Sequence, residues 1–147
     1  MVEYGAFGLC GNRATQRRFR SDPVTDGLLK ALLACAQSAP SKSDLQQYSI
    51  IVVQNADKRH AIADLCRAGR QMDEAPKLLV FCADMRRGQK IAELRGHPHA
   101  NNNMDTFLNA VVDTALAMQA FIQAAESVGL GCCPISALRN PIGAVSE

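Results

Sequence analysis

The chain has 147 residues, of which 48% are hydrophobic and 20% are charged, and its formal net charge is +2. An apolar fraction of this size excludes a disordered chain, because it is enough for one buried core. The low net charge, the few aromatic residues and the absence of tryptophan argue against a nucleic-acid partner. We therefore expect a single domain over residues 1–147.

Six cysteines are present, and their spacing predicts buried, reduced thiols instead of disulfides. Cys35, Cys66 and Cys82 fall within apolar patterns, Cys132 and Cys133 are adjacent, and no Cys-x-x-Cys pair suggests zinc. The first residues lack the order of a signal peptide, and no apolar run approaches the roughly 20 residues of a membrane helix. We expect a cytoplasmic protein with no membrane partner.

The first half of the chain alternates helical and strand patterns after a weakly patterned, glycine-containing start over residues 1–12. Apolar residues at helical spacing predict helices over residues 23–37 and 56–67. Two runs rich in β-branched or apolar residues predict strands, Tyr48–Gln54 and Lys77–Ala83, the second covered on both faces. The intervening residues 69–76 are predicted to form a loop.

The second half contains the longest predicted element. Residues 84–103 are polar and irregular, which favours a mobile segment or lid. Residues 104–127 predict a helix of roughly 36 Å that is apolar on several faces, so a second subunit is expected to cover it. Asp113 within that helix is expected to have a buried partner or to face a subunit seam.

After the long helix, two glycines and a proline predict where the next elements end and begin. Gly129 and Gly131 predict a C-cap and a turn, and Cys132 to Ile135 predict a short strand. Pro141 predicts the first position of a last helix, which runs for about two turns to the end of the sequence. An amphipathic helix this short is marginal alone, so we expect the sequence to be a fragment of a longer protein.

Three polar segments are candidates for ligand binding. Arg13, Thr15 and Arg17 alternate along the chain, so they share a face of an extended segment and suit a phosphate group. The plainer interpretation of this segment is a solvated basic arm. His97 and His99 lie in a polar loop and are interpreted as solvated surface and not as metal ligands.

The other two segments follow a helix end and a strand. Ser41, Asp44 and Gln46 offer hydroxyl, carboxylate and amide groups in a short span after Pro40, although an ordinary capped turn has the same composition. Pro134, Ile135 and Ser136 end the predicted short strand. Their side chains and backbone amides suit the face and edge of a flat ligand, and an interior strand is compatible with that role.

Taken together, these segments resemble the FMN-dependent nitroreductase family, in its NADPH-type nitroreductase and flavin reductase branch. Arg13-x-Thr15-x-Arg17-x-Phe19 resembles the family's Arg-x-Ser-x-Arg-x-Phe motif, with Thr15 in place of serine. The segment Ala39-Pro-Ser-Lys-Ser-Asp-Leu-Gln46 resembles its Ala-Pro-Ser-x-x-Asn-x-Gln loop, with Asp44 in place of asparagine. Residues 112–119, 124–131 and 134–140 resemble its central helix, the exit from that helix, and the strand end beside the flavin.

The resemblance implies an α+β fold, with a mixed β-sheet flanked by helices and a long central dimer helix in an intertwined homodimer. It implies hydride transfer from NADPH or NADH through FMN to a small-molecule electron acceptor, a nitro compound, quinone or flavin, with no catalytic side chain named. Residues 85–103 are expected to form part of the substrate mouth. The implied cofactor-binding residues are Arg13, Thr15, Arg17, Ser41, Asp44, Gln46, Gln71, Pro134, Ile135 and Ser136.

Family members continue beyond the point at which this sequence ends. We therefore expect the 147-residue chain to bind FMN weakly or not at all, and a longer parent protein to bind it well. Two alternatives stay open from the residues alone. One is a non-catalytic flavin-binding or sensor domain, and the other is a structural helical dimerisation module with a basic arm.

Overall fold

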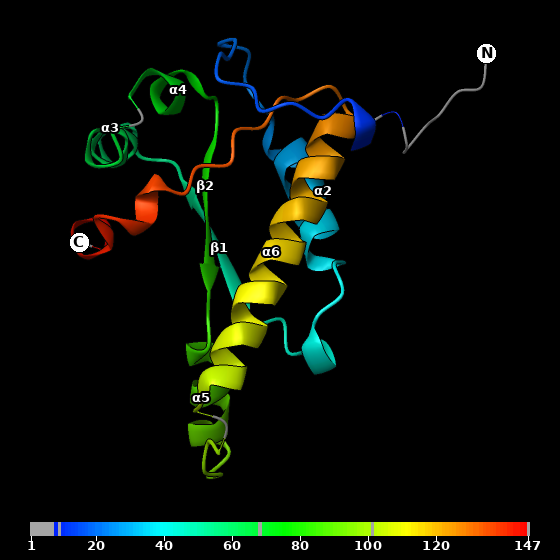
Figure 1. Cartoon of the computed structure of the whole chain (residues 1–147), viewed down its shortest axis with the longest axis vertical. Coiled ribbons are helices and arrows are strands. Elements are labelled where there is room, and N and C mark those ends of the chain that lie inside the picture. Colours follow the sequence, from blue (N-terminus) through cyan, green and yellow to red (C-terminus); the bar gives the residue numbers. More distant parts are fainter. Residues whose placement is uncertain (1–7, 9, 68, 101, 147) are drawn as a thin grey trace. The chain divides into compact units, whose positions relative to one another are not determined.

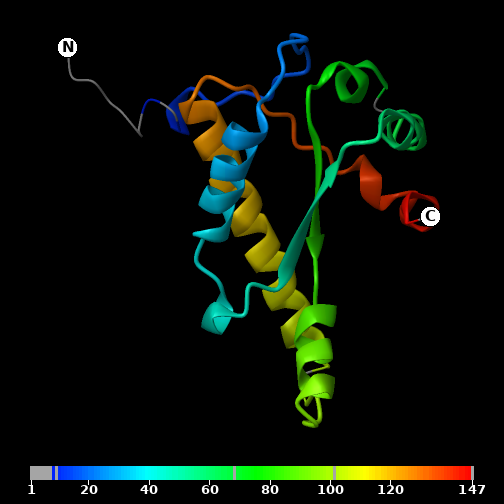
Figure 2. The ribbon, with the colours of Figure 1, turned by 180° about the vertical axis from the view of Figure 1, so that it is seen from behind.

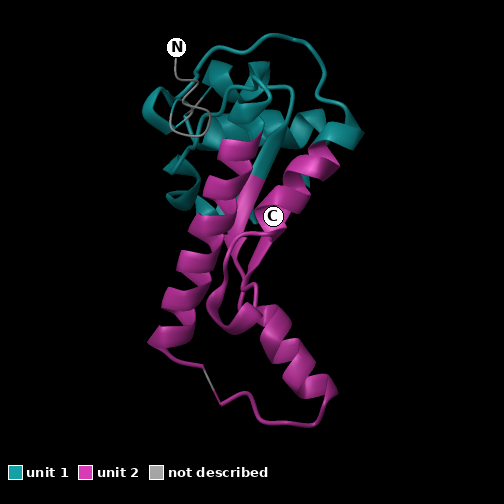
Figure 3. Cartoon of the chain, turned by 90° about the vertical axis from the view of Figure 1, so that its right-hand side faces the viewer, with its two compact units in different colours: residues 1–28, 52–79, 125–147 teal, residues 29–51, 80–124 magenta. Residues whose placement is uncertain are grey.

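The computed structural model describes residues 8, 10–67, 69–100 and 102–146, and contact clustering divides the chain into two compact units. Unit 1 comprises residues 1–28, 52–79 and 125–147, and unit 2 comprises residues 29–51 and 80–124 (Figure 3). Parts of three sequence predictions lie outside the described residues, namely residues 1–7 and 9 of the weakly patterned start, Asn101 of the polar segment and Glu147 of the predicted last helix. The assignment of residues 1–147 to one domain stays a prediction.

Helices dominate the described residues and accompany one small sheet, which confirms the α+β class. Two strands, β1 (Tyr48–Val53) and β2 (Leu78–Ala83), form a hydrogen-bonded antiparallel pair (Figure 1). The described sheet is therefore smaller than the mixed sheet that we expected. The helices are α2 (Asp26–Gln37), α3 (Ala56–Leu65), α4 (Gly69–Glu74), α5 (Arg86–Leu94), α6 (Met104–Ser127) and α7 (Ile142–Val145), with 3₁₀ turns η1 (Lys42–Asp44) and η2 (Ala137–Arg139).

The longest helix, α6, has the bounds that the sequence predicts (Figure 2). The side-chain oxygen of Asn103 accepts a hydrogen bond from the Thr106 amide at 3.1 Å and so caps the first turn. At the other end, Gly129 has a φ of 84°, and the Leu130 amide donates to the Ala125 carbonyl at 3.0 Å. This is a Schellman ending, which requires the left-handed conformation that glycine adopts without strain.

Two segments that we expected to be irregular are helical. In place of a loop at residues 69–76, α4 buries Met72 and carries an ion pair between Arg70 and Glu74. In place of an irregular lid, α5 begins where the Asp84 carboxylate accepts the Arg86 amide at 2.9 Å, and it ends at Leu94, two residues before Gly96 with its φ of 67°. Few of their positions are apolar, so the hydrophobic period could not reveal either helix.

The expected strand at Cys132–Ile135 is absent, and the segment is extended without a ladder. A single backbone hydrogen bond, from the Gln16 amide to the Cys132 carbonyl at 3.0 Å, joins it to the N-terminal segment. Pro134 has no amide hydrogen, so the segment cannot donate regularly to a neighbouring strand. The prediction of a strand here was wrong.

The six cysteines are thiols and not disulfides, as expected, but they are not uniformly buried. Cys66 is buried, and burial raises the pKa of its thiol. Cys10 and Cys35 are exposed, so the expectation of burial was wrong for them. On α2 the buried stripe consists of Leu29, Leu32 and Ala36, which leaves Cys35 on the outer face.

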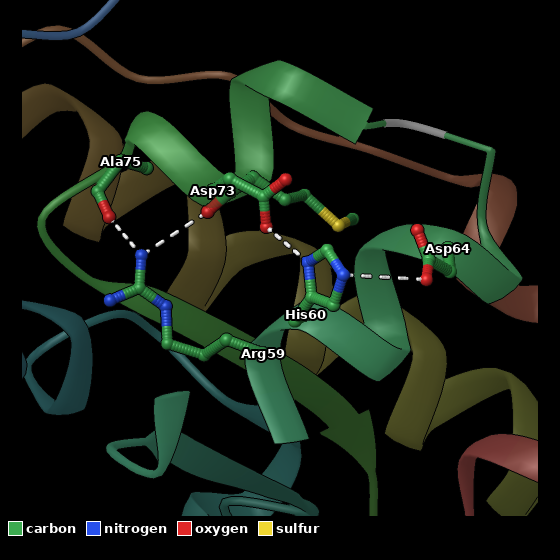
Figure 4. A network of polar contacts seen from close by, with 6 residues as sticks. Arg59, His60, Asp64, Asp73 and Ala75 are labelled. Carbon is green, nitrogen blue, oxygen red and sulfur yellow. Dashed lines mark hydrogen bonds and ion pairs between the residues drawn. The ribbon is translucent and has the colours of Figure 1, made fainter. Parts of the chain in front are cut away.

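Unit 1 has a compact core in which α3 packs against α4. Ala63, Cys66 and Met72 form the buried cluster, and Ile62, Ile135, Ala137 and Leu138 pack against it. A surface network of polar contacts joins the same two helices (Figure 4). Arg59 donates to the carbonyls of Met72, at 3.2 Å, and Ala75. The two ring nitrogens of His60 face Asp73 at 3.3 Å and Asp64 at 3.6 Å.

This network predicts a pH-dependent stability. The hydrogen bond to Asp73, and then the negative charge of Asp64, raise the pKa of His60 above its ordinary value. The stabilisation is therefore fully present below the unfolded-state pKa of about 6.5 and is lost as the pH rises through the folded-state pKa. We expect His60→Gln to lower the free energy of unfolding at about pH 5.5 and to have no effect near pH 9, measured by urea denaturation.

The exposed His97 offers a matched control for this substitution. His97→Gln should change the unfolding free energy equally little at both pH values. An effect of His60→Gln that is constant with pH, or that grows as the pH rises, would contradict the assigned role. Because His60 is exposed, the effect should also shrink in about 1 M salt.

Candidate functional site

In unit 1, the segment with Arg13, Thr15 and Arg17 lies against the turn that follows α6. Besides the hydrogen bond from Gln16 to Cys132, the Gln16 side chain approaches Gly131 so closely that a Cβ added there would lie 2.7 Å from its Cγ. Gly131 is therefore needed for close packing of two distant segments. This contact joins two of the three predicted motifs.

Arg13, Thr15 and Arg17 differ in their exposure and in their ion pairs. Arg13 and Thr15 are half-buried, and the Nε of Arg13 lies 3.6 Å from Oε1 of Glu126, without a hydrogen bond between these atoms. Arg17 is exposed, and no ion pair to its guanidinium is found among the described residues. Arg17 is thus the cation best placed to meet an external anion, whereas Arg13 is already charge-paired.

Unit 1 also contains the strand-end residues and Gln71. Ile135 is half-buried and packs against the core cluster of Ala63, Cys66 and Met72. Its neighbours Pro134 and Ser136 are exposed, which follows from the alternation of side chains along an extended segment. Gln71 lies on α4 and is half-buried. Of residues 134–136, Pro134 and Ser136 therefore present side chains to the outside.

In unit 2, the third predicted motif folds into a tight loop that we call the 41–47 loop, residues 41–47. The Gln46 amide donates to the Ser41 hydroxyl at 3.2 Å, and the Gln46 side chain donates to Asp44 at 3.2 Å. All three predicted residues of this motif are thus brought together by hydrogen bonds. These side-chain hydrogen bonds alone fit the ordinary capped turn and a ligand-binding loop equally well.

The backbone of this loop distinguishes it from an ordinary turn. Three of its non-glycine residues, Ser43, Asp44 and Gln46, have φ values of 52°, 55° and 47°. Non-glycine residues seldom adopt this left-handed region, and each such residue costs free energy of about 1 kcal/mol or more. Such backbone strain is concentrated at ligand-binding sites and persists only where surrounding contacts hold it.

Contacts of that kind come from α6 and from α5. The buried carboxylate of Asp113 accepts hydrogen bonds from the amides of Lys42, at 3.0 Å, and Gln47, at 3.2 Å. The interpretation of Asp113 as a group with a buried partner is confirmed. The Arg87 guanidinium donates to the Gln46 carbonyl. Sequence reasoning missed Arg87, because it lies in the segment that we expected to be irregular.

A second carboxylate supports α5 and was also missed. The Ser49 hydroxyl donates to Asp84, and the amides of Arg86 and Arg87 point at the same carboxylate. The Ser49 hydrogen bond, opposed by desolvation and aided by these amides, lowers the pKa of Asp84. Asp84 lies two residues before the first residue of α5, so a capping role was the one signal that the sequence offered.

A hollow of about 520 Å³ lies beside α5 in unit 2. Its lining is rich in charged side chains: Asp84, Arg86, Arg87, Gln89, Lys90 and Glu93. Arg87 thus both lines the hollow and supports the 41–47 loop. The hollow falls within the segment that we expected to form part of a substrate mouth, and that role stays a prediction.

Each unit by itself offers groups that suit a polar ligand. Unit 1 offers a free guanidinium and a threonine hydroxyl, which suit a phosphate. Unit 2 offers hydroxyl, carboxylate and amide groups, which both donate and accept hydrogen bonds. Among the described residues, no group of three His, Cys, Asp or Glu side chains is placed to hold a metal ion.

By length and composition alone, α6 is also apolar enough to cross a membrane. Its packing argues for a protein interior instead, because Asp113 on this helix is only 2% exposed and is hydrogen-bonded to the backbone of unit 2. A buried carboxylate with protein partners is typical of the core helix of a globular protein. The apolar character of α6 is therefore explained by burial and by its exposed face, considered below.

Comparison with known proteins gives matches over most of the chain. An oxygen-insensitive NADPH nitroreductase from Salmonella typhimurium is 39% identical over 140 residues, which cover 95% of this chain and 56% of the relative. An FMN reductase (NADPH) from Bacillus subtilis is 34% identical, over 92% of this chain and 55% of that protein. The chain therefore spans about half the length of these relatives.

A solved structure agrees with the sequence matches. The NfrA1 nitroreductase from B. subtilis superimposes with a TM-score of 0.93 and 33% identity, over 97% of this chain and 58% of that one. The model of the Nitroreductase family matches residues 11–146, almost the whole chain. The chain belongs to the nitroreductase family.

Proposed function

We propose that this chain is the FMN-binding part of an NAD(P)H-dependent flavin oxidoreductase. The observation that carries the proposal is the 41–47 loop with its three left-handed residues. Its Lys42 and Gln47 amides donate to Asp113 on α6, and its Gln46 carbonyl accepts from Arg87 on α5. Such a loop, in a chain related to NADPH nitroreductases and FMN reductases, suits the binding of a specific polar ligand. The dimerisation-module alternative does not require such a loop, whereas a flavin sensor would use it in the same way.

In this proposal the predicted residues bind and orient the cofactor. Arg17, with Arg13 and Thr15, would hold the phosphate, and the 41–47 loop would hold the ribityl chain and the ring edge through Ser41, Asp44 and Gln46. Pro134, Ile135 and Ser136 would lie along the ring, with Ile135 contributing through its place in the core, and Gln71 would lie near it. When bound, FMN supplies hydride acceptance from NADPH or NADH and reduction of a small-molecule acceptor.

We further propose a homodimer that forms through the outer face of α6. Met104, Phe107, Leu108, Val111, Val112 and Leu116 are large apolar residues on this helix, and all are exposed, from 39% to 76%. Their spacing puts them on one face, opposite the buried stripe of Thr106, Ala110, Asp113 and Ala117. A contiguous apolar face of this kind marks an interface. A dimer that covers this face would be soluble, in keeping with a cytoplasmic enzyme.

The free guanidinium of Arg17 gives a test of cofactor binding. We expect FMN to bind saturably, although weakly, in a titration followed by the quenching of flavin fluorescence. Arg17→Ala should raise the Kd by roughly tenfold, because a charge-assisted contact to phosphate is lost. Arg20→Ala is the matched control, since Arg20 is exposed and paired with Asp22, and it should change the Kd less than about twofold. Equal effects of the two substitutions would argue for nonspecific attraction.

Turnover separates the enzyme from a flavin sensor. With saturating FMN and a quinone acceptor, we expect the chain to oxidise NADPH or NADH continuously, at a rate proportional to protein concentration. A sensor would give at most one equivalent of reduced flavin per chain and then stop. Saturable FMN binding without turnover would therefore contradict the oxidoreductase and favour the sensor alternative.

The outer face of α6 gives a test of the dimer. Leu108→Asp should shift the sedimenting species from twice the 15.8 kDa chain mass to the chain mass itself, because a charge would be buried in an apolar seam. Leu94→Asp on α5 is the matched control, because Leu94 is more exposed than Leu108 and lies outside this face. A wild-type chain that sediments as a monomer at about 100 μM would refute the dimer.

A further inference from the structure

The carboxylate of Asp113 joins the two ends of the 41–47 loop. Its Oδ1 accepts the amide of Lys42 at 3.0 Å, and its Oδ2 accepts the amide of Gln47 at 3.2 Å. The two donors flank the residues Ser43, Asp44 and Gln46, which have the left-handed backbone. Because one rigid carboxylate binds both amides, it fixes the distance between the ends of the strained segment.

The position of Asp113 makes this connection firm. The residue is 2% exposed and belongs to the buried stripe of α6, with Ala110 and Ala117 on either side. A carboxylate at such a position is tolerated only when its oxygens accept hydrogen bonds, so the loop and the helix depend on each other. The helix is the longest element of the chain, and it gives the loop an anchor that local contacts cannot supply.

The other contacts of the loop come from its own residues, from the exposed side chain of Arg87, or from the backbone, as where the Asp84 amide donates to the Gln47 carbonyl at 3.0 Å. The Ser41 hydroxyl accepts the Gln46 amide at 3.2 Å, and the Arg87 guanidinium donates to the Gln46 carbonyl. Ser41 belongs to the loop itself, and Arg87 is exposed on α5. Only Asp113 ties the loop to a buried side chain in the hydrogen bonds of the described residues. Both of its oxygens are engaged by backbone amides.

We propose that Asp113 is a positioning residue for the flavin, which acts by holding the 41–47 loop in its left-handed conformation. This inference rests on the proposed FMN binding. Asp113 itself does not touch the cofactor, and Ser41, Asp44 and Gln46 transmit its effect. The requirement is for two acceptors at position 113, which only a carboxylate of this length supplies.

Asp113→Asn is the discriminating variant, because asparagine has almost the same shape but offers one acceptor and directs an amide group at the second N–H. We expect it to raise the Kd for FMN by about tenfold in the fluorescence titration, in proportion to the loss of one buried hydrogen bond. The amide of Lys42 or of Gln47 should exchange with deuterium at least about tenfold faster, as followed by NMR, while the amides of α6 exchange unchanged. Asp105→Asn, at an exposed carboxylate on the same helix, should do neither.

A role in general stability predicts a different result. In that case Asp113→Asn would speed exchange throughout unit 2, and the Kd of the folded fraction for FMN would stay the same. This outcome, or unchanged exchange at both Lys42 and Gln47, would overturn the inference. If Asp113→Asn does not fold, exchange in the unsubstituted chain decides: Lys42 and Gln47 must exchange more slowly than Ser43, and equal rates would overturn the inference.

Failure of the proposed function would look different again. If the unsubstituted chain shows no saturable FMN binding, the proposed function fails, and a role for Asp113 toward the flavin falls with it. The exchange rates at Lys42 and Gln47 would still show whether Asp113 holds the loop. Slow exchange that depends on Asp113, together with FMN binding that does not, would overturn only the positioning role.

Discussion

The two hydrogen bonds that Asp113 accepts connect the longest helix of the chain to its most strained loop. The donors, Lys42 and Gln47, are 71 and 66 residues away in the sequence, so these are contacts of the folded state and not of local structure. A loop of left-handed residues would relax in isolation, since each such residue costs free energy. It persists because a buried carboxylate that lost its amide partners would cost still more.

The same helix has opposite requirements on its two sides. On one side, the buried stripe from Thr106 to Ala117 is made of small or polar residues, which lets the 41–47 loop approach the helix backbone to within hydrogen-bonding distance of Asp113. On the other side large apolar residues are exposed, and a contiguous apolar face of this kind is typical of a surface that another subunit covers. The largely apolar composition of α6 is therefore no sign of a membrane span here. It follows from one face that packs within the chain and another that suits a second subunit.

The sequence predicts the helices and strands that contain runs or regular repeats of apolar residues, and it misses the helices that do not. The bounds of α6 and the positions of β1 and β2 follow from runs of apolar residues, which dominate their environment. The helices α4 and α5 are not predicted, because no apolar stripe stabilises them. Hydrogen bonds at their ends and an ion pair such as Arg70–Glu74 do so instead. The expected strand at residues 132–135 fails for a related reason: its composition favours a strand, but Pro134 prevents a regular ladder.

In the candidate site, the residues that suit a ligand can be predicted from the sequence, and the residues that support them cannot. Residues that suit a ligand, such as Arg17 or Ser41, can be recognised from the sequence because the functional groups of their side chains match groups of the ligand. Residues that hold those groups in place, such as Asp113 and Arg87, cannot be recognised in this way. A carboxylate or guanidinium can form many kinds of contact, and here its partners are backbone atoms. Backbone amides and carbonyls are present at every position, so which of them a distant side chain will bind depends on the fold. The supporting residues of a binding loop therefore become visible only when the chain is folded.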